Sequence, residues 1–171
     1  MNCLNLVVIN NRVFSREQVL QWCKEVSLKN PSDAFILLAL FEGIRGEAYR
    51  DIADLKLSDF NEDELTVQLP YSKKTVKVSQ MLYDYAKKSD EIFSYNSLLG
   101  SAEIALLDDG LIIKNKNNSI AGADIRNRNR RVEKRVGLIS EYLGLGNLIT
   151  SKSLLESGVV YYVNEKRKET G

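Results

Sequence analysis

The sequence predicts a mainly helical α+β domain, and three observations support this fold class. Apolar residues recur at helical spacing along most of the chain. Residues 61–78 instead alternate apolar and polar residues, as the two strands of a β-hairpin do. The chain has 171 residues with 44% hydrophobic content, which is enough to bury one core, so a single domain is expected.

The first half of the chain is expected to form two longer helices, a short one and the hairpin. Ser15 opens a capping-box pattern ahead of a helix over 15–27. The next run, "NPSDAFILLALFEG", is apolar on all sides, which predicts a buried helix that ends near Gly43. A short helix is expected within "GEAYRDIADLKLSDF". The hairpin turn "PYSKK" places Lys73 and Lys74 at or near its tip.

The second half is expected to contain three helices and a second hairpin. One helix follows the N-cap residue Ser79, and "EIALLDDGLIIK" predicts a hairpin that turns at 108–110. A regular apolar stripe predicts a long helix over 125–143. Residues 150–158, "TSKSLLESG", predict a short helix that begins at its first or second residue and ends at its glycine. The segment 159–171 is expected to be a frayed basic tail.

The composition excludes several classes of site. The chain has no histidine, which removes Ser-His-Asp and Cys-His catalysis and every metal site that needs a histidine. Cys3 and Cys23 are the only cysteines, too few for a disulfide framework or a zinc finger. No nucleotide-binding glycine motif and no membrane-spanning apolar run occur. We therefore expect no cofactor, no metal, no membrane and no small-molecule substrate.

Positive charge is concentrated in one segment. Residues 126–135 contain six basic side chains against one acidic side chain, a net charge of +5, whereas the whole chain carries +1. The basic residues are Arg126, Arg128, Arg130, Arg131, Lys134 and Arg135. Such a basic face on an otherwise mildly acidic domain is typical of proteins that bind phosphate backbones. The alternative is an ordinary solvated helix face, although its like charges at i and i+4 would then repel each other.

The order of elements and one motif resemble the catalytic domain of tyrosine recombinases, the phage integrases. The first motif of that family reads roughly "tGlR-x-x-E-l-x-x-L-x-w-s-D". The stretch "EGIRGEAYRDIADLKLSDF" is similar apart from a small spacing difference, and the matching residues are Gly43, Arg45, Leu55, Ser58 and Asp59. The resemblance implies a recombinase-like fold with a small antiparallel hairpin sheet. It also implies one C-terminal domain over 1–171, with a core at 13–158, a tail at 159–171 and no N-terminal core-binding domain in this chain.

The resemblance assigns roles to individual residues. Arg45 corresponds to the arginine that binds the scissile phosphate, and Lys73 or Lys74 corresponds to the hairpin lysine that acts as general acid in active members. In "ITSKSLLESG", Lys152 replaces the first histidine of the family's HxxR motif and Leu155 replaces its arginine. Leucine cannot donate a hydrogen bond to a phosphate, and the tyrosines that follow are too near to be the family's nucleophile. The resemblance therefore implies relic positions without catalysis.

Each of these assignments has a simpler alternative. Arg45 could be a cation that interacts with the C-terminal end of a helix, or it could pair with Glu42 or Glu47. Lys73 and Lys74 could be ordinary turn lysines.

Three functions follow from these observations. The first is a sequence-specific DNA-binding regulator on an inactive recombinase scaffold, similar to the integrase-like lysogeny repressors of SPβ-like phages (the MrpR or YopR group). Its partner would be double-stranded DNA in the cytoplasm of a bacterial host, and a homo-oligomer is compatible with it. The second is a fragment of an active recombinase that exchanges DNA strands. The third is a protein-interaction module without nucleic acid.

Overall fold

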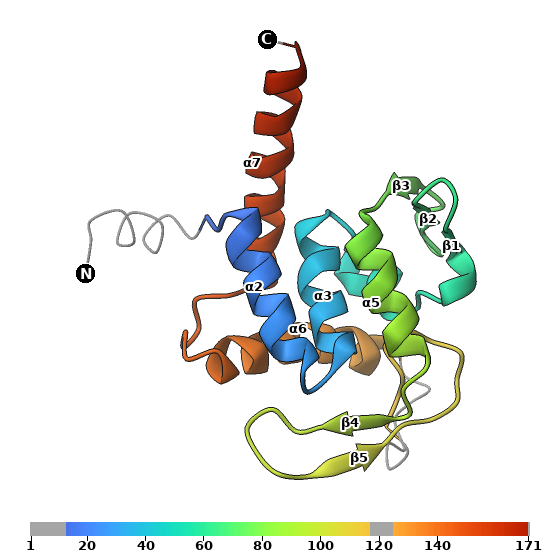
Figure 1. The fold of residues 1–171 in the computed structure, drawn as a ribbon. Coiled ribbons are helices and arrows are strands. Elements are labelled where there is room, and N and C mark those ends of the chain that lie inside the picture. The colour runs from blue at the N-terminus through green and yellow to red at the C-terminus, as the bar shows by residue number, and fades with distance from the viewer. Residues whose placement is uncertain (1–12, 117–124, 171) are drawn as a thin grey trace.

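Helices make up most of the structure, and two small antiparallel sheets lie beside them (Figure 1). The computed structural model describes residues 13–116 and 125–170, without the side chains of 125–128. The mainly helical α+β class is confirmed.

The helix α3 (Pro31–Phe41) forms the centre of the molecule. Every residue from Asp33 to Phe41 is buried, as its uninterrupted apolar sequence predicts. The helices packed against it are α2 (Arg16–Ser27), α5 (Gln80–Asp90), α6 (Ile125–Tyr142) and α7 (Ser151–Thr170). Because the surrounding helices cover α3 on all sides, its position is fixed. The segments at its two ends are therefore held in place as well.

The start of α2 confirms the predicted capping box. The Oγ atom of Ser15 accepts a hydrogen bond from the Gln18 N–H at 3.1 Å, and the Ser15 N–H donates to the Gln18 side chain at 3.0 Å. Both groups would otherwise be left without partners at the helix N-terminus. The helix then buries Val19, Cys23 and Val26.

The short helix after α3 differs from the prediction. The chain forms a 3-10 turn, η1 (Glu47–Tyr49), and then a helix of four residues, α4 (Arg50–Ala53). Ala48 and Tyr49 have positive φ angles of 50° and 63°, which an α-helix cannot accommodate. The regular helix therefore begins only at Arg50, and a second 3-10 turn, η2 (Leu57–Asp59), follows it.

The first hairpin is confirmed and gains a third strand. The strands β1 (Phe60–Asn61), β2 (Thr66–Gln68) and β3 (Thr75–Lys77) pair antiparallel in that order. Val67 on the central strand lies opposite both Phe60 and Val76, so the apolar positions share one register.

The predicted second hairpin is wrong in its pairing. The strand β5 (Glu103–Ala105) pairs with β4 (Ser94–Asn96), which precedes it, and the turn lies between them instead of at 108–110. The Asp109 carboxylate accepts hydrogen bonds from the backbone N–H groups of Leu111 and Asn115, which folds this segment into a loop. A side chain that satisfies backbone groups in this way competes with strand pairing.

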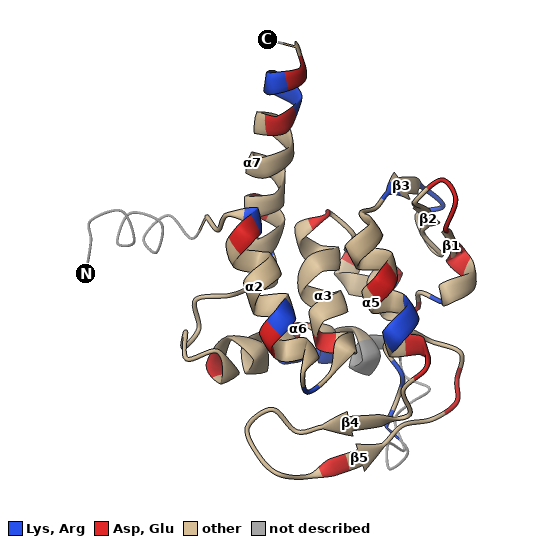
Figure 2. Cartoon of the chain, in the orientation of Figure 1, with Lys and Arg blue, Asp and Glu red and all other residues tan. Residues whose placement is uncertain are grey.

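The last helix is much longer than predicted. We expected a helix closed by Gly158 and a frayed tail, but α7 runs through this glycine to Thr170. A Cβ atom at Gly158 would lie 1.7 Å from the carbonyl oxygen of Phe41, so the glycine serves a close helix crossing and does not end the helix. Beyond this crossing α7 extends away from the body (Figure 1), and Figure 2 shows an uncharged middle section and an outer end with charges of both signs. None of the described helices is long and apolar enough to span a membrane.

A buried carboxylate joins the end of α3 to the start of α5. Glu42 is 8% exposed, and its carboxylate accepts hydrogen bonds from the Ser79 N–H at 2.7 Å and the Ser79 hydroxyl at 2.5 Å. Burial raises the pKa of Glu42 above its usual 4.5, although the hydrogen bonds from Ser79 oppose the shift.

We expect Glu42 to make the domain less stable as the pH rises. Between pH 4.5 and the raised pKa, the folded state binds more protons at Glu42 than the unfolded state does, so the free energy of unfolding falls with increasing pH. The loss amounts to about 1.4 kcal/mol for each unit of pKa shift. Glu42→Gln should remove this slope in urea titrations at several pH values, whereas Glu133→Gln, at an exposed site, should keep it. If the free energy of unfolding of Glu42→Gln depends on pH as that of the unmodified protein does, Glu42 is not the group responsible.

Candidate nucleic-acid interface

Arg45 lies just beyond the C-terminal end of α3 and is exposed. Gly43 has a φ angle of +90°, which ends the helix, and the next residue, Ile44, is fully buried. The Ile44 N–H donates to the carbonyl oxygen of Ala39 at 2.9 Å. The backbone on the N-terminal side of Arg45 is therefore fixed by burial and hydrogen bonding while its guanidinium reaches solvent.

The expected ion-pair partners of Arg45 are not used. Glu42 is bound to Ser79, and across residues 13–116 and 125–170 no carboxylate lies within 4.0 Å of the Arg45 guanidinium. This leaves the charge of Arg45 available for an external anion.

Tyr49 connects Arg45 to the first residue of α7. The guanidinium carbon of Arg45 lies 5.1 Å from the centre of the Tyr49 ring, and the Tyr49 hydroxyl is hydrogen-bonded to the Ser151 hydroxyl. Lys152 follows and is exposed. The contacts of Tyr49 thus link Arg45 to the residue before Lys152, more than a hundred residues away in sequence.

Asp51 holds the turn that contains the two hairpin lysines. Its side chain is almost fully buried, and its Oδ1 atom accepts hydrogen bonds from the backbone N–H groups of Tyr71 at 2.7 Å and Ser72 at 3.2 Å. The next two residues are Lys73 and Lys74, both exposed. Charge-assisted hydrogen bonds of this kind are stronger than neutral ones, so the lysines sit on an anchored turn.

The same carboxylate touches the backbone that follows Arg45. Gly46 has a φ angle of +71°, and a Cβ atom there would lie 2.3 Å from the Oδ2 atom of Asp51. Asp51 therefore lies between the segment after Arg45 and the turn with Lys73. Sequence reasoning missed this residue, because nothing local to Asp51 shows that its partners are twenty residues away.

Arg50 is a further cation that the sequence did not single out. Its guanidinium carbon lies 4.1 Å from the centre of the Tyr71 ring, and the Tyr71 hydroxyl donates to the carboxylate of Asp54. A cation over an aromatic face is favourable by about 0.5–2 kcal/mol. This stacking is a second contact between α4 and the lysine turn.

The helix α6 packs against η1 and α4, the elements that follow Arg45. Arg130 and Lys134 are exposed on it, and Arg131 is half-buried. The side chains of Arg126 and Arg128 lie outside the described residues. The predicted basic face is therefore present on the described part of α6, but only some of its members are open to solvent.

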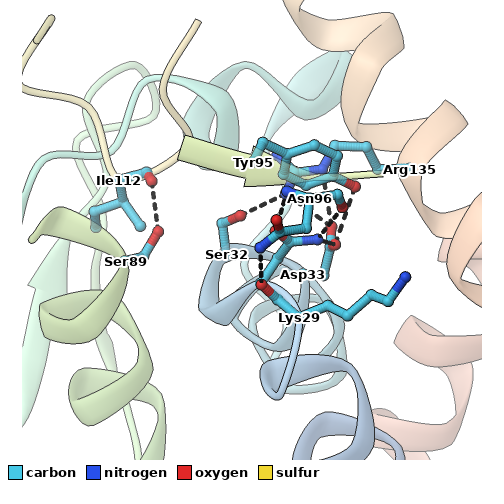
Figure 3. Close-up of polar contacts among 9 residues, drawn as sticks. Lys29, Ser32, Asp33, Ser89, Tyr95, Asn96, Ile112 and Arg135 are labelled. Atoms are coloured by element: carbon cyan, nitrogen blue, oxygen red, sulfur yellow. Dashed lines mark hydrogen bonds and ion pairs between the residues drawn. The ribbon is translucent and has the colours of Figure 1, made fainter. Parts of the chain in front are cut away.

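Arg135 is engaged inside the molecule. Its guanidinium donates to the Oδ1 atom of Asp33 and to the Ser32 hydroxyl, and it lies 4.6 Å from the centre of the Tyr95 ring (Figure 3). The Arg135 side chain is 14% exposed and that of Asp33 is fully buried. Burial raises the pKa of Tyr95 to about 12. Arg135 thus joins α6 to the first turn of α3, and its charge is already matched.

The segment aligned with the recombinase HxxR motif has no cation at its second position. Lys152 is exposed, with its ammonium 3.9 Å from the Glu156 carboxylate, and Leu155 stands where the resemblance expects arginine. Tyr161 and Tyr162 pack near Phe41, with ring centres at 5.8 Å and 6.3 Å. Burial, together with nearby Glu42, raises the pKa of Tyr162 to about 12, which opposes nucleophilic use of its hydroxyl.

Comparison with protein families decides the relationship. The family model "MrpR, C-terminal catalytic domain" matches residues 13–171, nearly the whole chain. The chain belongs to the MrpR C-terminal domain family. This confirms the family expected from the sequence. The match includes the part of α7 beyond Gly158, so this MrpR-type domain includes the complete long helix. No curated protein matches the chain.

Proposed function

We propose that this MrpR-type domain binds double-stranded DNA as a regulator, of the repressor kind, and does not cut it. The proposed contacts to phosphates are the exposed cations around the end of α3 and on the adjacent helix α6. The exposed ones are Arg45, Lys73, Lys74, Arg130, Lys134 and Lys152. The proposal also includes the half-buried Arg131 and, from the sequence, Arg126 and Arg128, whose side chains lie outside the described residues. Arg135 is not included because its charge is paired with Asp33.

The strongest support for the proposal is the position of Asp51, between the turn that contains Lys73 and the backbone after Arg45. Asp51 accepts hydrogen bonds from the turn that precedes Lys73 and lies close to Gly46, and Tyr49 connects Arg45 to α7. A set of cations on a fixed frame binds phosphates at lower entropic cost than flexible side chains would. Phosphate contacts position a protein on DNA, whereas base contacts select the sequence.

The absence of strand cleavage is part of the proposal. Stabilising the transition state of phosphoryl transfer needs several fixed donors, and losing one such donor costs about 10²–10³ in rate. Leu155 cannot donate, Glu156 would repel a phosphate, and burial beside Glu42 raises the pKa of the Tyr162 hydroxyl to about 12. The word "catalytic" in the family's description makes the active alternative worth a direct test.

The salt dependence of DNA binding tests the proposal. The variant Lys73→Gln/Lys74→Gln should bind a short DNA duplex at least about tenfold more weakly, because contacts to phosphates are lost. The plot of log affinity against log salt concentration should also become less steep, by about 0.9 for each lost phosphate contact. The matched control is Lys87→Gln/Lys88→Gln, which removes the same charge from exposed positions on α5. Equal affinity loss in both variants would show that only net charge matters and would overturn the assigned surface.

Two further outcomes separate the alternatives. A covalent protein–DNA adduct trapped on a nicked duplex would show that the chain is an active recombinase fragment. Weak binding that does not change with salt would instead favour a protein-interaction module, because backbone recognition must release counterions.

A further inference from the structure

A cavity of about 280 Å³ lies at the opposite end of α3 from Arg45. Its walls come from the first turn of α3, the end of α5, β4, the loop 106–116 and α6. Figure 3 shows Ser89 and Ile112 on one side of this region and Ser32, Tyr95 and Arg135 on the other, and all five residues line the cavity. The volume is close to the lower limit for small-molecule sites, about 300–1,000 Å³, so an occupant has to be compact.

The charged residues that line the cavity in the described part of the chain are all basic. Among the described residues that line it, five are basic and none is acidic; the basic ones are Lys114, Lys116, Arg131, Lys134 and Arg135. Three of them already have partners within the fold, and one of these is Arg131, whose guanidinium donates to the Asn115 side chain at 2.8 Å. The Lys114 ammonium donates to the carbonyl oxygens of Ser89 and Asp90 at the end of α5, and Arg135 is paired with Asp33.

Lys116 lies among the other basic residues of the cavity wall. Its ammonium lies 5.5 Å from the centre of the Tyr95 ring, and Arg131, Lys134 and Arg135 line the same cavity. Burial lowers the pKa of Lys116, and the charges of these three neighbours lower it further, while Asp33 opposes the shift only weakly. An anion in the cavity would relieve this repulsion.

The rest of the wall is apolar. Ile92, Leu106, Ile113 and Leu138 line the cavity together with Ile112 and the ring of Tyr95. An apolar wall with a few convergent polar groups is the usual composition of a small-molecule site. It differs from a surface that follows a nucleic-acid backbone, which is exposed and polar along its length.

We propose that this cavity binds a small amphipathic anion, with its carboxylate or phosphate head beside Lys116 and Lys134 and its apolar body against Ile113 and Leu138. The head would be held by charge-assisted hydrogen bonds, and the body would displace water from the apolar wall. The site overlaps the proposed DNA interface at Arg131 and Lys134, whereas Lys116, Ile113 and Leu138 belong to the cavity alone.

Calorimetric titration of the full chain tests the proposal with three probes of similar length. Octanoate and hexyl phosphate present the two head groups, and octanol presents the same apolar body without charge. Octanoate or hexyl phosphate is expected to bind saturably at one site, at least about tenfold more tightly than octanol, because a charged hydrogen bond contributes about 1.5–3 kcal/mol. Comparing the two anions shows which head group the site prefers.

Lys116→Gln supplies the matched variant, with Lys77→Gln, at an exposed position on β3, as its control. Lys116→Gln is expected to weaken anion binding at least about tenfold, and Lys77→Gln and Lys73→Gln/Lys74→Gln are expected to leave it unchanged. Equal affinities for octanoate and octanol, or full anion affinity in Lys116→Gln, would overturn the proposal. So would a result in which no probe binds while Lys116→Gln weakens DNA binding, since that would make the cavity wall part of the DNA interface.

Discussion

Gly158→Ala is expected to destabilise the domain by about 2 kcal/mol or more, whereas Gly137→Ala is expected to stabilise it by up to about 1 kcal/mol. Both glycines lie inside helices, so the same helix-propensity gain of about 1 kcal/mol applies to both. The two sites differ in their surroundings. Apart from the neighbouring backbone of its own helix, no described atom lies within 4 Å of a Cβ built on Gly137, but one built on Gly158 lies 1.7 Å from the Phe41 carbonyl oxygen.

The opposing atom is backbone at the end of α3, so it cannot rotate away as a side chain would. An alanine at 158 therefore forces α7 away from α3 and opens the contact between Phe41 and the tyrosine rings that follow it. Thermal unfolding followed by circular dichroism measures the effect. About 2–4 °C in Tm is expected per kcal/mol for a chain of this size. A Gly158→Ala variant as stable as Gly137→Ala would contradict the observed helix crossing.

Arg135→Met is expected to destabilise the domain by about 3–5 kcal/mol, because it leaves the buried carboxylate of Asp33 without its cation. Asp33 also accepts hydrogen bonds from Asn30 and Tyr95, and these cannot replace a full charge. The double variant Asp33→Asn/Arg135→Met should lose less than the sum of the single losses, which a double-mutant cycle in urea measures.

Arg130→Met is the control for this ion pair. It removes the same charge from the same helix at an exposed position, where a change within about 0.5 kcal/mol is expected. The two variants should also differ in DNA binding at a temperature where both are folded. Arg130→Met is expected to reduce the salt slope, and Arg135→Met is expected to leave it unchanged. A reduced salt slope in Arg135→Met, with an unchanged slope in Arg130→Met, would show that Arg135 belongs to the DNA interface.

Local sequence was sufficient wherever a few neighbouring residues determine the structure. The capping box at Ser15, the all-round apolar run of α3 and the alternation around Val67 each specify their element within a few residues. The exposed positions of Arg45, Lys73 and Lys74 also agree with the motif and turn that suggested them.

Sequence reasoning was insufficient where a distant contact decides the structure. Gly158 reads locally as a helix stop, and only the approach of Phe41 explains a glycine inside a continuing helix. The strand at 103–105 pairs with β4, whose Asn96 backbone is held by the Asn30 side chain 66 residues earlier. Arg135 looked like one more member of a basic face, because its partner Asp33 lies 102 residues away in sequence.

The burial of α3 has a consequence for communication across the domain. This helix of 11 residues is about 16 Å long, with the cavity at its first turn and Arg45 just beyond its last. Close packing on all sides makes bending of α3 costly, which favours movement of the whole helix over a local change at one end. If an occupant of the cavity shifts α3 as one body and thereby changes the affinity of the Arg45 end for phosphate, thermodynamic reciprocity requires DNA to change the affinity of the cavity by the same factor.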